Sequence, residues 1–231
     1  HEAMKLIKDP ETRKRIKDQV KLGTRLGSEV RSYEPIENPE DVVITIYPGH
    51  PELQGKSVAE LARIGNYDDP YEFFLDTVSS DRTFGVLSFD VWEEDVRTLV
   101  RSPLAMIGTD SSFADDINQP NRHPRAYGSY ARVLGRYVRD ERLTSWEEAV
   151  MKMSSRPHAK LGIHDRGLVR PGFCADLVLF NPSTVMDTAD YSGKAAYPEG
   201  IEYVFVNGEL VISGGRHTRA TPGRLLRQCQ H

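Results

Sequence analysis

The segment Leu104–Asp110 limits the possible folds of this chain more strongly than any other. It reads Leu-Ala-Met-Ile-Gly-Thr-Asp, a short apolar run that follows a helical pattern and ends in a carboxylate. A run of this kind is typical of a buried parallel strand. Open α/β sheets and (β/α)8 barrels carry their chemistry at the carboxyl ends of such strands. We therefore predict that Asp110 lies in a functional site.

The role of Asp110 is open at this point, because a carboxylate at a strand end serves as a general base, a metal ligand or a helix cap. Ser111 and Ser112 follow it without the Gly-x-Ser-x-Gly setting of a hydrolase nucleophile, which favours loop hydrogen bonding. Residues 111–122 are rich in Ser, Asp, Asn and Pro and have no periodicity. They predict a long loop above the strand end, where loops are usually functional.

The residues before this segment predict a βαβ unit. Strands are expected at 42–47 and 84–89, and a helix follows the second of them. One face of that helix carries the apolar residues Val91, Trp92, Val96, Leu99 and Val100. A strand, a helix and a strand in this order predict parallel pairing of 84–89 with 104–110.

Arg125 lies beyond the loop, at the start of an amphipathic helix with Tyr130, Val133, Leu134, Tyr137 and Val138 on one face. Its planar guanidinium suits bidentate capture of a carboxylate, and the alternative is an ordinary exposed arginine. His123 either supports that role or orients the turn. From about residue 167 the pattern changes to strands at 175–180 and 203–212, the latter a hairpin with an Asn-Gly turn, which predicts a small β domain.

Capping residues predict where the remaining helices begin. Asp9-Pro10 begins a polar helix over 9–27, Ser57 and Asp69-Pro70 begin two packing helices, and Ser145 begins a fourth. Residues 157–161 predict a short turn.

Charge and composition exclude several classes of protein. The 231 residues include 30 basic and 34 acidic side chains that are scattered along the chain, so no nucleic-acid-binding stripe is expected. The apolar runs are shorter than the roughly 20 residues of a membrane span, and we expect a cytoplasmic protein. Cys174 and Cys229 are expected to be free thiols.

The histidines form no motif of a metal site. The chain has no His-x-His and no His-Glu-x-x-His, and no cysteine lies near a histidine at ligand spacing. His50 follows a strand on a loop, where it either approaches a site or is solvated. His158 and His164 are expected at the surface.

Several motifs resemble those of the N-acyl-D-amino-acid deacylases (D-aminoacylases), a family of the amidohydrolase superfamily. The resemblance begins at Met106–Ser112 and at the His-Pro-Arg motif of 123–125 and covers nearly the whole chain. It extends through residues 9–13, 51–57, 126–128, 132–139, 147–153, 165–172, 175–180 and 200–208.

The resemblance implies an α/β fold: the C-terminal part of a (β/α)8 amidohydrolase barrel at 1–166 with an appended small β-sandwich domain at 167–231. A whole barrel takes roughly 250 residues, so we interpret the chain as the C-terminal portion of such an enzyme. The implied activity is zinc-dependent hydrolysis of an N-acyl-D-amino acid to a D-amino acid and a carboxylate.

Within that family, Asp110 matches the aspartate that acts as general base or acid at the zinc site, and we assign it as a catalytic and metal residue. Arg125 matches the arginine that binds the substrate's α-carboxylate. The family's histidine and cysteine zinc ligands have no counterpart here, so we expect the chain to need an N-terminal portion of the same enzyme and to be inactive alone. Two alternatives are a cyclic amidase of the dihydropyrimidinase or dihydroorotase kind and a non-catalytic assembly module.

Overall fold

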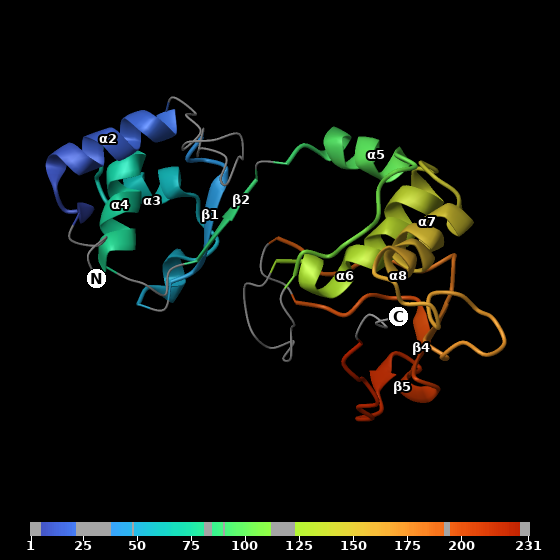
Figure 1. The fold of residues 1–231 in the computed structure, drawn as a ribbon. Coiled ribbons are helices and arrows are strands. Elements are labelled where there is room, and N and C mark those ends of the chain that lie inside the picture. The colour runs from blue at the N-terminus through green and yellow to red at the C-terminus, as the bar shows by residue number, and fades with distance from the viewer. Residues whose placement is uncertain are drawn as a thin grey trace. The chain divides into compact units, whose positions relative to one another are not determined.

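The computed structural model describes residues 6–21, 38–47, 49–80, 85–89, 91–111, 123–191 and 195–226. The chain forms two compact units, residues 1–91 and 92–231, which are considered separately (Figure 1). Within the described residues, no helix is both long and apolar enough to cross a membrane. The predicted division of the chain at residue 166 into a barrel part and a β domain stays a prediction.

The described part of the first unit contains helices and an antiparallel pair of strands. In chain order these are α2 (Pro10–Lys21), β1 (Val42–Ile46), η1 (Pro51–Leu53), α3 (Val58–Ile64), α4 (Pro70–Ser80) and β2 (Gly85–Ser88). The core of this unit is formed by Val42, Ile44, Val58 and Leu61, which are almost completely buried. The strand predicted at 42–47 is thereby confirmed.

The two strands of this unit pair antiparallel, with Val42 opposite Ser88 and Ile44 opposite Val86. The prediction of a parallel βαβ unit is therefore wrong for β2, which corresponds to the strand expected at 84–89; Phe84 lies outside the described residues. β2 finds its partner in a strand that precedes it by about forty residues, and no parallel neighbour for it is present among the described segments.

Helix α2 is held to α4 by charge and not by apolar packing. Arg13 forms ion pairs with Glu72 at 2.7 Å and with Asp76, and Lys17 pairs with Asp69 at 3.2 Å and with Glu72. This agrees with the polar helix that the sequence predicts from residue 9. The expected helix end near Gly27 lies outside the described residues.

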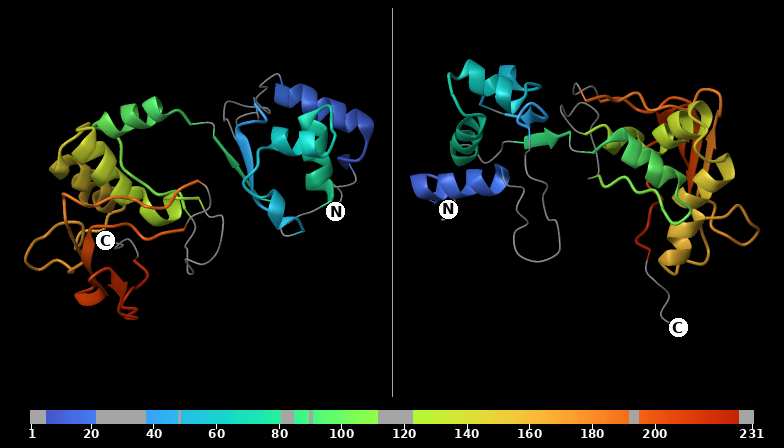
Figure 2. Two further views of the ribbon diagram at one scale, coloured as in Figure 1. Left: turned by 180° about the vertical axis from the view of Figure 1, so that it is seen from behind. Right: turned by 90° about the horizontal axis from the view of Figure 1, so that it is seen from above.

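The second unit consists of a helical layer and a small sheet. The helices are α5 (Glu93–Arg101), α6 (Arg125–Arg132), the π-helix η2 (Val133–Asp140), α7 (Trp146–Met153) and α8 (Ser155–Lys160). The strands are β3 (Leu177–Phe180), β4 (Ile201–Val206), β5 (Glu209–Ser213) and β6 (Arg216–His217). Figures 1 and 2 show β4 and β5 beyond the helices, on the side away from α5.

The sheet is an antiparallel meander in the order β3-β4-β5-β6. Asn207 and Gly208 join β4 to β5 with φ angles of 51° and 82°, which only a turn of type I′ requires at both positions. The predicted strand at 175–180 and the Asn-Gly hairpin are confirmed. The structure describes one sheet here, so the sandwich that the resemblance implies stays a prediction.

The core of the second unit joins the helices to the sheet. Its buried members include Val100, Ala131, Val133, Leu134, Tyr137, Val138, Ala149 and Val185. Trp146 of α7 stacks on Phe180 of β3 with ring centroids 5.8 Å apart. The predicted amphipathic face is confirmed at four of its five positions, whereas Tyr130 is 43% exposed.

The prediction of a strand at 104–110 is wrong for the described residues. A turn at Pro103 and Leu104 precedes the segment, alternate side chains from Leu104 to Asp110 are exposed as in a strand, and no described strand pairs with them. The Ile107 N–H donates to the Lys152 carbonyl of α7 at 3.2 Å. A strand requires a hydrogen-bonded neighbouring strand, and the described part of the chain contains none for this segment.

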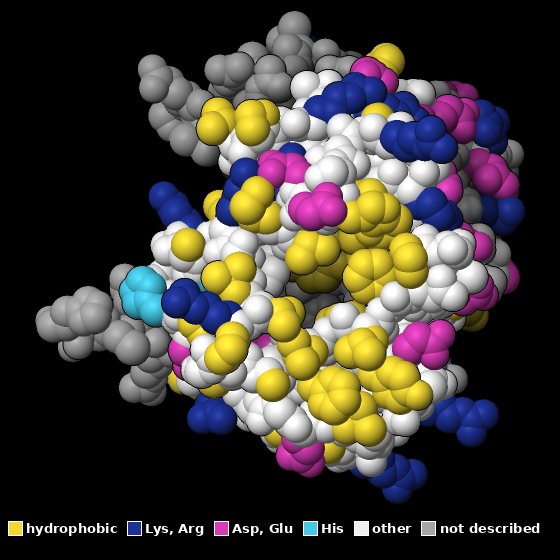
Figure 3. All heavy atoms as spheres, turned by 90° about the vertical axis from the view of Figure 1, so that its right-hand side faces the viewer, with side chains coloured by type: hydrophobic (Ala, Val, Ile, Leu, Met, Phe, Trp, Pro, Cys, Tyr) yellow, Lys and Arg dark blue, Asp and Glu magenta, His cyan; other side chains and the backbone are white. Residues whose placement is uncertain are grey.

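The apolar face of α5 is only partly covered. Val100 is buried and Val96 packs against the core, but Val91, Trp92 and Leu99 are 71%, 78% and 62% exposed. Leu104 is also 91% exposed. Only Val96 and Val100 of the predicted apolar face therefore contact the core. Figure 3 shows a broad group of hydrophobic side chains on another face of this part of the molecule.

The predicted helix starts are confirmed by their hydrogen bonds. The side chains of Asp9, Ser57 and Ser145 accept the backbone N–H of Thr12, Glu60 and Glu148, respectively. Each satisfies a donor that the first turn of a helix would otherwise leave without a partner. The turn expected at 157–161 is found as part of α8.

An ion cluster fixes α5 to the end of η2. Glu141 accepts from Arg97 at 2.8 Å and from Arg136 at 2.9 Å, and Arg136 also approaches Glu93 at 3.2 Å. The two guanidinium groups lower the pKa of Glu141 from its ordinary 4.5 to about 2. Because the folded pKa is lowered, this stabilisation is present above pH 4.5 and is lost as the pH falls towards 2.

We therefore expect Glu141→Gln to flatten the loss of stability of the chain between about pH 4.5 and 2. The thermal midpoint of the parent and variant chains, measured across this range, checks the prediction. Glu209→Gln is the matched control, since its carboxylate forms no described ion pair. An unchanged slope in Glu141→Gln would contradict the assigned cause.

Candidate functional site

Asp110 ends the extended segment of the second unit with its side chain in the open. The side chain is 90% exposed, and the backbone φ is 46°, in the left-handed region that aspartate tolerates better than most residues. Its Oδ2 lies 3.2 Å from Nη1 of Arg125. The structure thus brings together the two residues that the sequence singled out, although most of the loop predicted between them, residues 112–122, lies outside the described residues.

Arg125 begins α6, and its backbone is capped by the preceding histidine. The Arg125 N–H donates to Nδ1 of His123 at 3.1 Å, whereas Pro124 at the cap position provides no side-chain acceptor. First-turn N–H groups have no partner within a helix, so the imidazole takes the place of a capping oxygen. Of the two roles left open for His123, this contact supports the one of orienting the turn.

The surroundings of His123 lower its pKa and so favour the neutral imidazole. Burial lowers its pKa, the charge of Arg125 lowers it further, and the carboxylate of Asp110 acts in the opposite direction. A neutral imidazole has one nitrogen free to accept a hydrogen bond. The lowered pKa therefore agrees with Nδ1 acting as the acceptor for Arg125.

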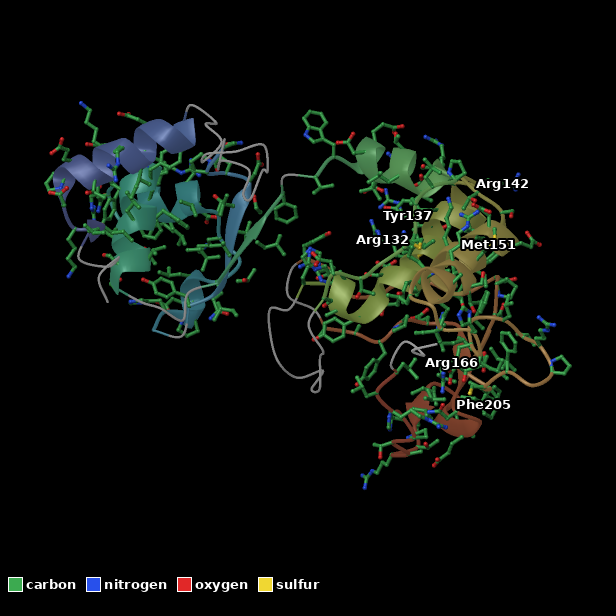
Figure 4. All side chains as sticks on the ribbon, viewed as in Figure 1. Arg132, Tyr137, Arg142, Met151, Arg166 and Phe205 are labelled. Atoms are coloured by element: carbon green, nitrogen blue, oxygen red, sulfur yellow. The ribbon has the colours of Figure 1, made fainter. Side chains whose placement is uncertain are left out.

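A cavity of about 230 Å³ lies beside Arg125. The start of α6 and a segment between β3 and β4 line it, chiefly through His123, Arg125, Arg132, Asp187, Asp190 and Tyr191. Arg132 pairs with Asp187 at 3.1 Å, and Tyr191 packs against His123. In Figure 4, the labelled Arg132 and Tyr137 extend from the α6 and η2 region, and Tyr137 donates to Glu93 of α5 at 2.7 Å.

Sequence reasoning missed the segment 185–191. Its residues carry no periodic or motif signal of a site, and they reach α6 only through the tertiary fold. Gly128 and Gly135, seven residues apart and therefore on one helix face, were the sequence feature from which a close chain approach could have been inferred.

The described histidines of the sequence analysis lie apart from a metal-binding group. His50 is in the first unit, where it is half exposed and lies 3.3 Å from Glu52. His164 is exposed, and His158 is partly exposed with Nδ1 2.8 Å from the Ser154 carbonyl. No group of three or more His, Cys, Asp or Glu residues in the described chain could hold a metal ion. Cys174 is a free thiol; Cys229 lies outside the described residues.

The sequence of the chain also matches a model of a known protein family. The model described as "Amidohydrolase family" matches residues 67–212, which include Asp110, Arg125, β3 and β4. The chain belongs to the amidohydrolase family. The α/β class predicted from the sequence agrees with this membership.

Curated relatives of this amidohydrolase chain come from Alcaligenes xylosoxydans xylosoxydans. An N-acyl-D-aspartate deacylase is 36% identical over 80% of the chain, and an N-acyl-D-glutamate deacylase is 36% identical over 82%. A D-aminoacylase is 35% identical over 80% of the chain. The chain spans only 35 to 37% of the length of these relatives. The predicted resemblance to this group of amidohydrolases is confirmed.

Solved structures agree with these matches. A D-aminoacylase crystal structure is 34% identical, with a TM-score of 0.69, over 80% of this chain and 37% of its own. An N-acyl-D-glutamate deacylase from Bordetella bronchiseptica, complexed with zinc and a phosphonate inhibitor, is 30% identical, with a TM-score of 0.66, over 90% of this chain and 44% of its own. One study of D-aminoacylase concerns its binuclear metal center.

The described residues of this amidohydrolase chain do not fit a complete zinc site. Asp110 is its one predicted metal residue, and its described partner is the cation Arg125 and not a second ligand. The Tyr127 hydroxyl is buried without a hydrogen-bond partner among the described residues, whereas buried polar groups are normally satisfied.

The exposure of Asp110 leads to a prediction about stability. We expect Asp110→Asn to change the free energy of unfolding of the chain by less than about 0.5 kcal/mol, because exposed ion pairs contribute little and asparagine tolerates a positive φ. Asp187→Asn, whose side chain is only 10% exposed against Arg132, should destabilise by about 1 to 3 kcal/mol. Denaturant unfolding measures both. A large loss in Asp110→Asn would assign Asp110 a structural role.

Proposed function

We propose that this chain is the C-terminal portion of a zinc-dependent amidohydrolase that hydrolyses N-acyl-D-amino acids to a D-amino acid and a carboxylate. The observation that carries the proposal is the 3.2 Å contact between Asp110 Oδ2 and Arg125 Nη1. It joins a carboxylate suited to proton transfer to a guanidinium suited to a substrate carboxylate. The named relatives support the substrate class.

The chemistry of the substrate explains why these two groups belong together. In an N-acyl-amino acid the amide nitrogen is two bonds from the carboxylate carbon. A substrate that places its carboxylate on Arg125 therefore brings its amide close to Asp110. The guanidinium has five N–H donors, so the donors not used by Asp110 are available to the substrate.

In this proposal Arg125 binds and orients, and Asp110 moves the proton. Asp110 takes a proton from the attacking water at a carboxylate oxygen as the new C–O bond forms, and then returns it to the amide nitrogen so that the C–N bond breaks and the amine leaves. Zinc would supply polarisation of the amide carbonyl. Apart from Asp110, its ligands are proposed to lie outside this chain.

The architecture belongs to the same proposal. Residues 1–166 are proposed to complete a (β/α)8 barrel together with an N-terminal portion of the same enzyme, and residues 167–231 to form one part of a β-sandwich. The length of the relatives supports the need for a further portion, since the chain covers 35 to 44% of them. A cyclic amidase receives less support, because the named relatives act on N-acyl-D-amino acids.

The roles of Asp110 and Arg125 should be distinguishable in the kinetics of the complete enzyme. We expect Asp110→Asn to lower kcat for N-acetyl-D-glutamate by at least about 100-fold with little change in KM, because proton transfer is lost. Arg125→Gln should raise KM by roughly 10- to 100-fold, because a charge-assisted contact to the carboxylate is lost.

Arg101→Gln is the matched control for these variants. Arg101 has a similar exposed fraction, 49% against 43% for Arg125, and pairs with Glu94 on the surface. Wild-type kinetics are expected for it. Full kcat in Asp110→Asn would contradict the catalytic assignment.

The isolated 231-residue chain is expected to show no turnover, and addition of the N-terminal portion should produce it. A pull-down of that portion by wild-type and Asp110→Asn chains, run beside the activity assay, separates catalysis from assembly. Unchanged association with lost activity supports catalysis, whereas retained activity favours a non-catalytic assembly module. Tight stoichiometric zinc binding with turnover by the chain alone would overturn the proposed division of the site.

A further inference from the structure

The chain between β3 and β4 lies directly on the helix that Arg125 begins. A Cβ atom at Gly135 would lie 2.3 Å from the Val185 carbonyl oxygen, and a Cβ at Gly128 would lie 2.5 Å from Cβ of Asp187. Contacts this short are not tolerated, so the approach depends on glycine at both positions. Val185 is completely buried by this packing.

Two arginines of the same helical stretch form hydrogen bonds with the segment between β3 and β4. Arg139 Nη1 donates to the Val185 carbonyl at 2.8 Å, and Arg132 Nη1 donates to Oδ2 of Asp187 at 3.1 Å. Together with the two glycines, these contacts fix the backbone of 185–187 against α6 and η2. The position of the residues that follow is set by this attachment.

The segment ends with an aromatic contact at the candidate site. The rings of Tyr191 and His123 lie edge to face, with centroids 5.3 Å apart and planes inclined by 81°. Nδ1 of the same His123 accepts the N–H of Arg125, and Arg125 contacts Asp110. A continuous series of contacts therefore runs from Tyr191 to the proposed catalytic carboxylate.

We propose that Tyr191 is a positioning residue, which holds the His123 ring in the orientation that caps Arg125 and thereby places the guanidinium for the substrate carboxylate. The inference rests on the proposed function for the identity of the ligand of Arg125. Tyr191 acts through His123 and not on the reacting atoms. Its ring makes the contact with the imidazole.

The proposal predicts an effect on binding and not on the chemical step. In the complete enzyme, we expect Tyr191→Leu to raise KM for N-acetyl-D-glutamate roughly two- to tenfold with kcat retained, as the loss of one aromatic pair implies. Tyr191→Phe keeps the ring and should restore the wild-type KM. Tyr197→Leu is the control, because Tyr197 lies on the same connection and is also exposed, at 64%.

A second measurement does not depend on activity. In the 231-residue chain, the NMR signals of the His123 ring and of the Arg125 backbone amide should shift in Tyr191→Leu and stay near their wild-type positions in Tyr191→Phe and Tyr197→Leu. If the wild-type enzyme does not turn over N-acyl-D-amino acids but these shifts are observed, the proposed function is wrong and the positioning contact is still supported.

Three results would overturn the proposal. These are an unchanged KM in Tyr191→Leu, an equal defect in Tyr191→Phe and Tyr191→Leu, and an Arg125 amide signal that does not respond to loss of the ring. A fall in kcat without a change in KM would also contradict it, because Tyr191 would then affect the chemical step.

Discussion

One buried lysine joins the parts of the second unit that carry Asp110. Lys152 of α7 is only 1% exposed, and its Nζ donates to the Val100 carbonyl in the last turn of α5 at 2.6 Å. Its own carbonyl accepts the N–H of Ile107. An unpaired buried ammonium would be strongly unfavourable, but carbonyl groups at a helix C-terminus carry partial negative charge. Lys152 therefore fixes the direction in which the chain leaves α5 and runs towards Asp110.

The same contact explains how an extended segment is held without a sheet. Burial lowers the pKa of Lys152, and Glu148 at 3.8 Å opposes that shift. Ile107 packs against the helical core, while Leu104 and Met106 on alternate positions remain exposed. One side of the segment thus packs on the helical core, and the other side presents exposed apolar side chains.

The features that sequence predicted correctly are those fixed by nearby residues. The Asp9, Ser57 and Ser145 caps act within three positions, and the Asn207-Gly208 turn needs only two residues that tolerate positive φ. The apolar run at 104–110 predicted a buried strand, but pairing is not a local property. The antiparallel partner of β2 and the missing neighbours of 104–110 depend on residues far along the chain or outside its described part.

The residues of the candidate site likewise divide into those that local sequence patterns predict and those that depend on distant parts of the chain. Asp110 and Arg125 could be found because one ends an apolar run and the other begins a helix, and the family resemblance gave each a role. Their contact could not be derived from residue patterns, since a loop without periodicity separates them. Tyr191 was missed because its approach to His123 follows from glycine packing at Gly128 and Gly135, which involves residues more than fifty positions apart.

Charge balance accounts for the contact between Asp110 and Arg125 in this chain. The exposed carboxylate of Asp110 lies 3.2 Å from the guanidinium of Arg125, which offsets its negative charge. Arg125 in turn is held by its backbone through His123, and the pairing therefore does not depend on the flexible guanidinium alone. Because a substrate carboxylate would share that guanidinium with Asp110, binding would loosen the pair at the moment when Asp110 is needed for proton transfer. On the proposed function, the contact that keeps the two residues together in the free chain is therefore also the one through which the substrate would activate them.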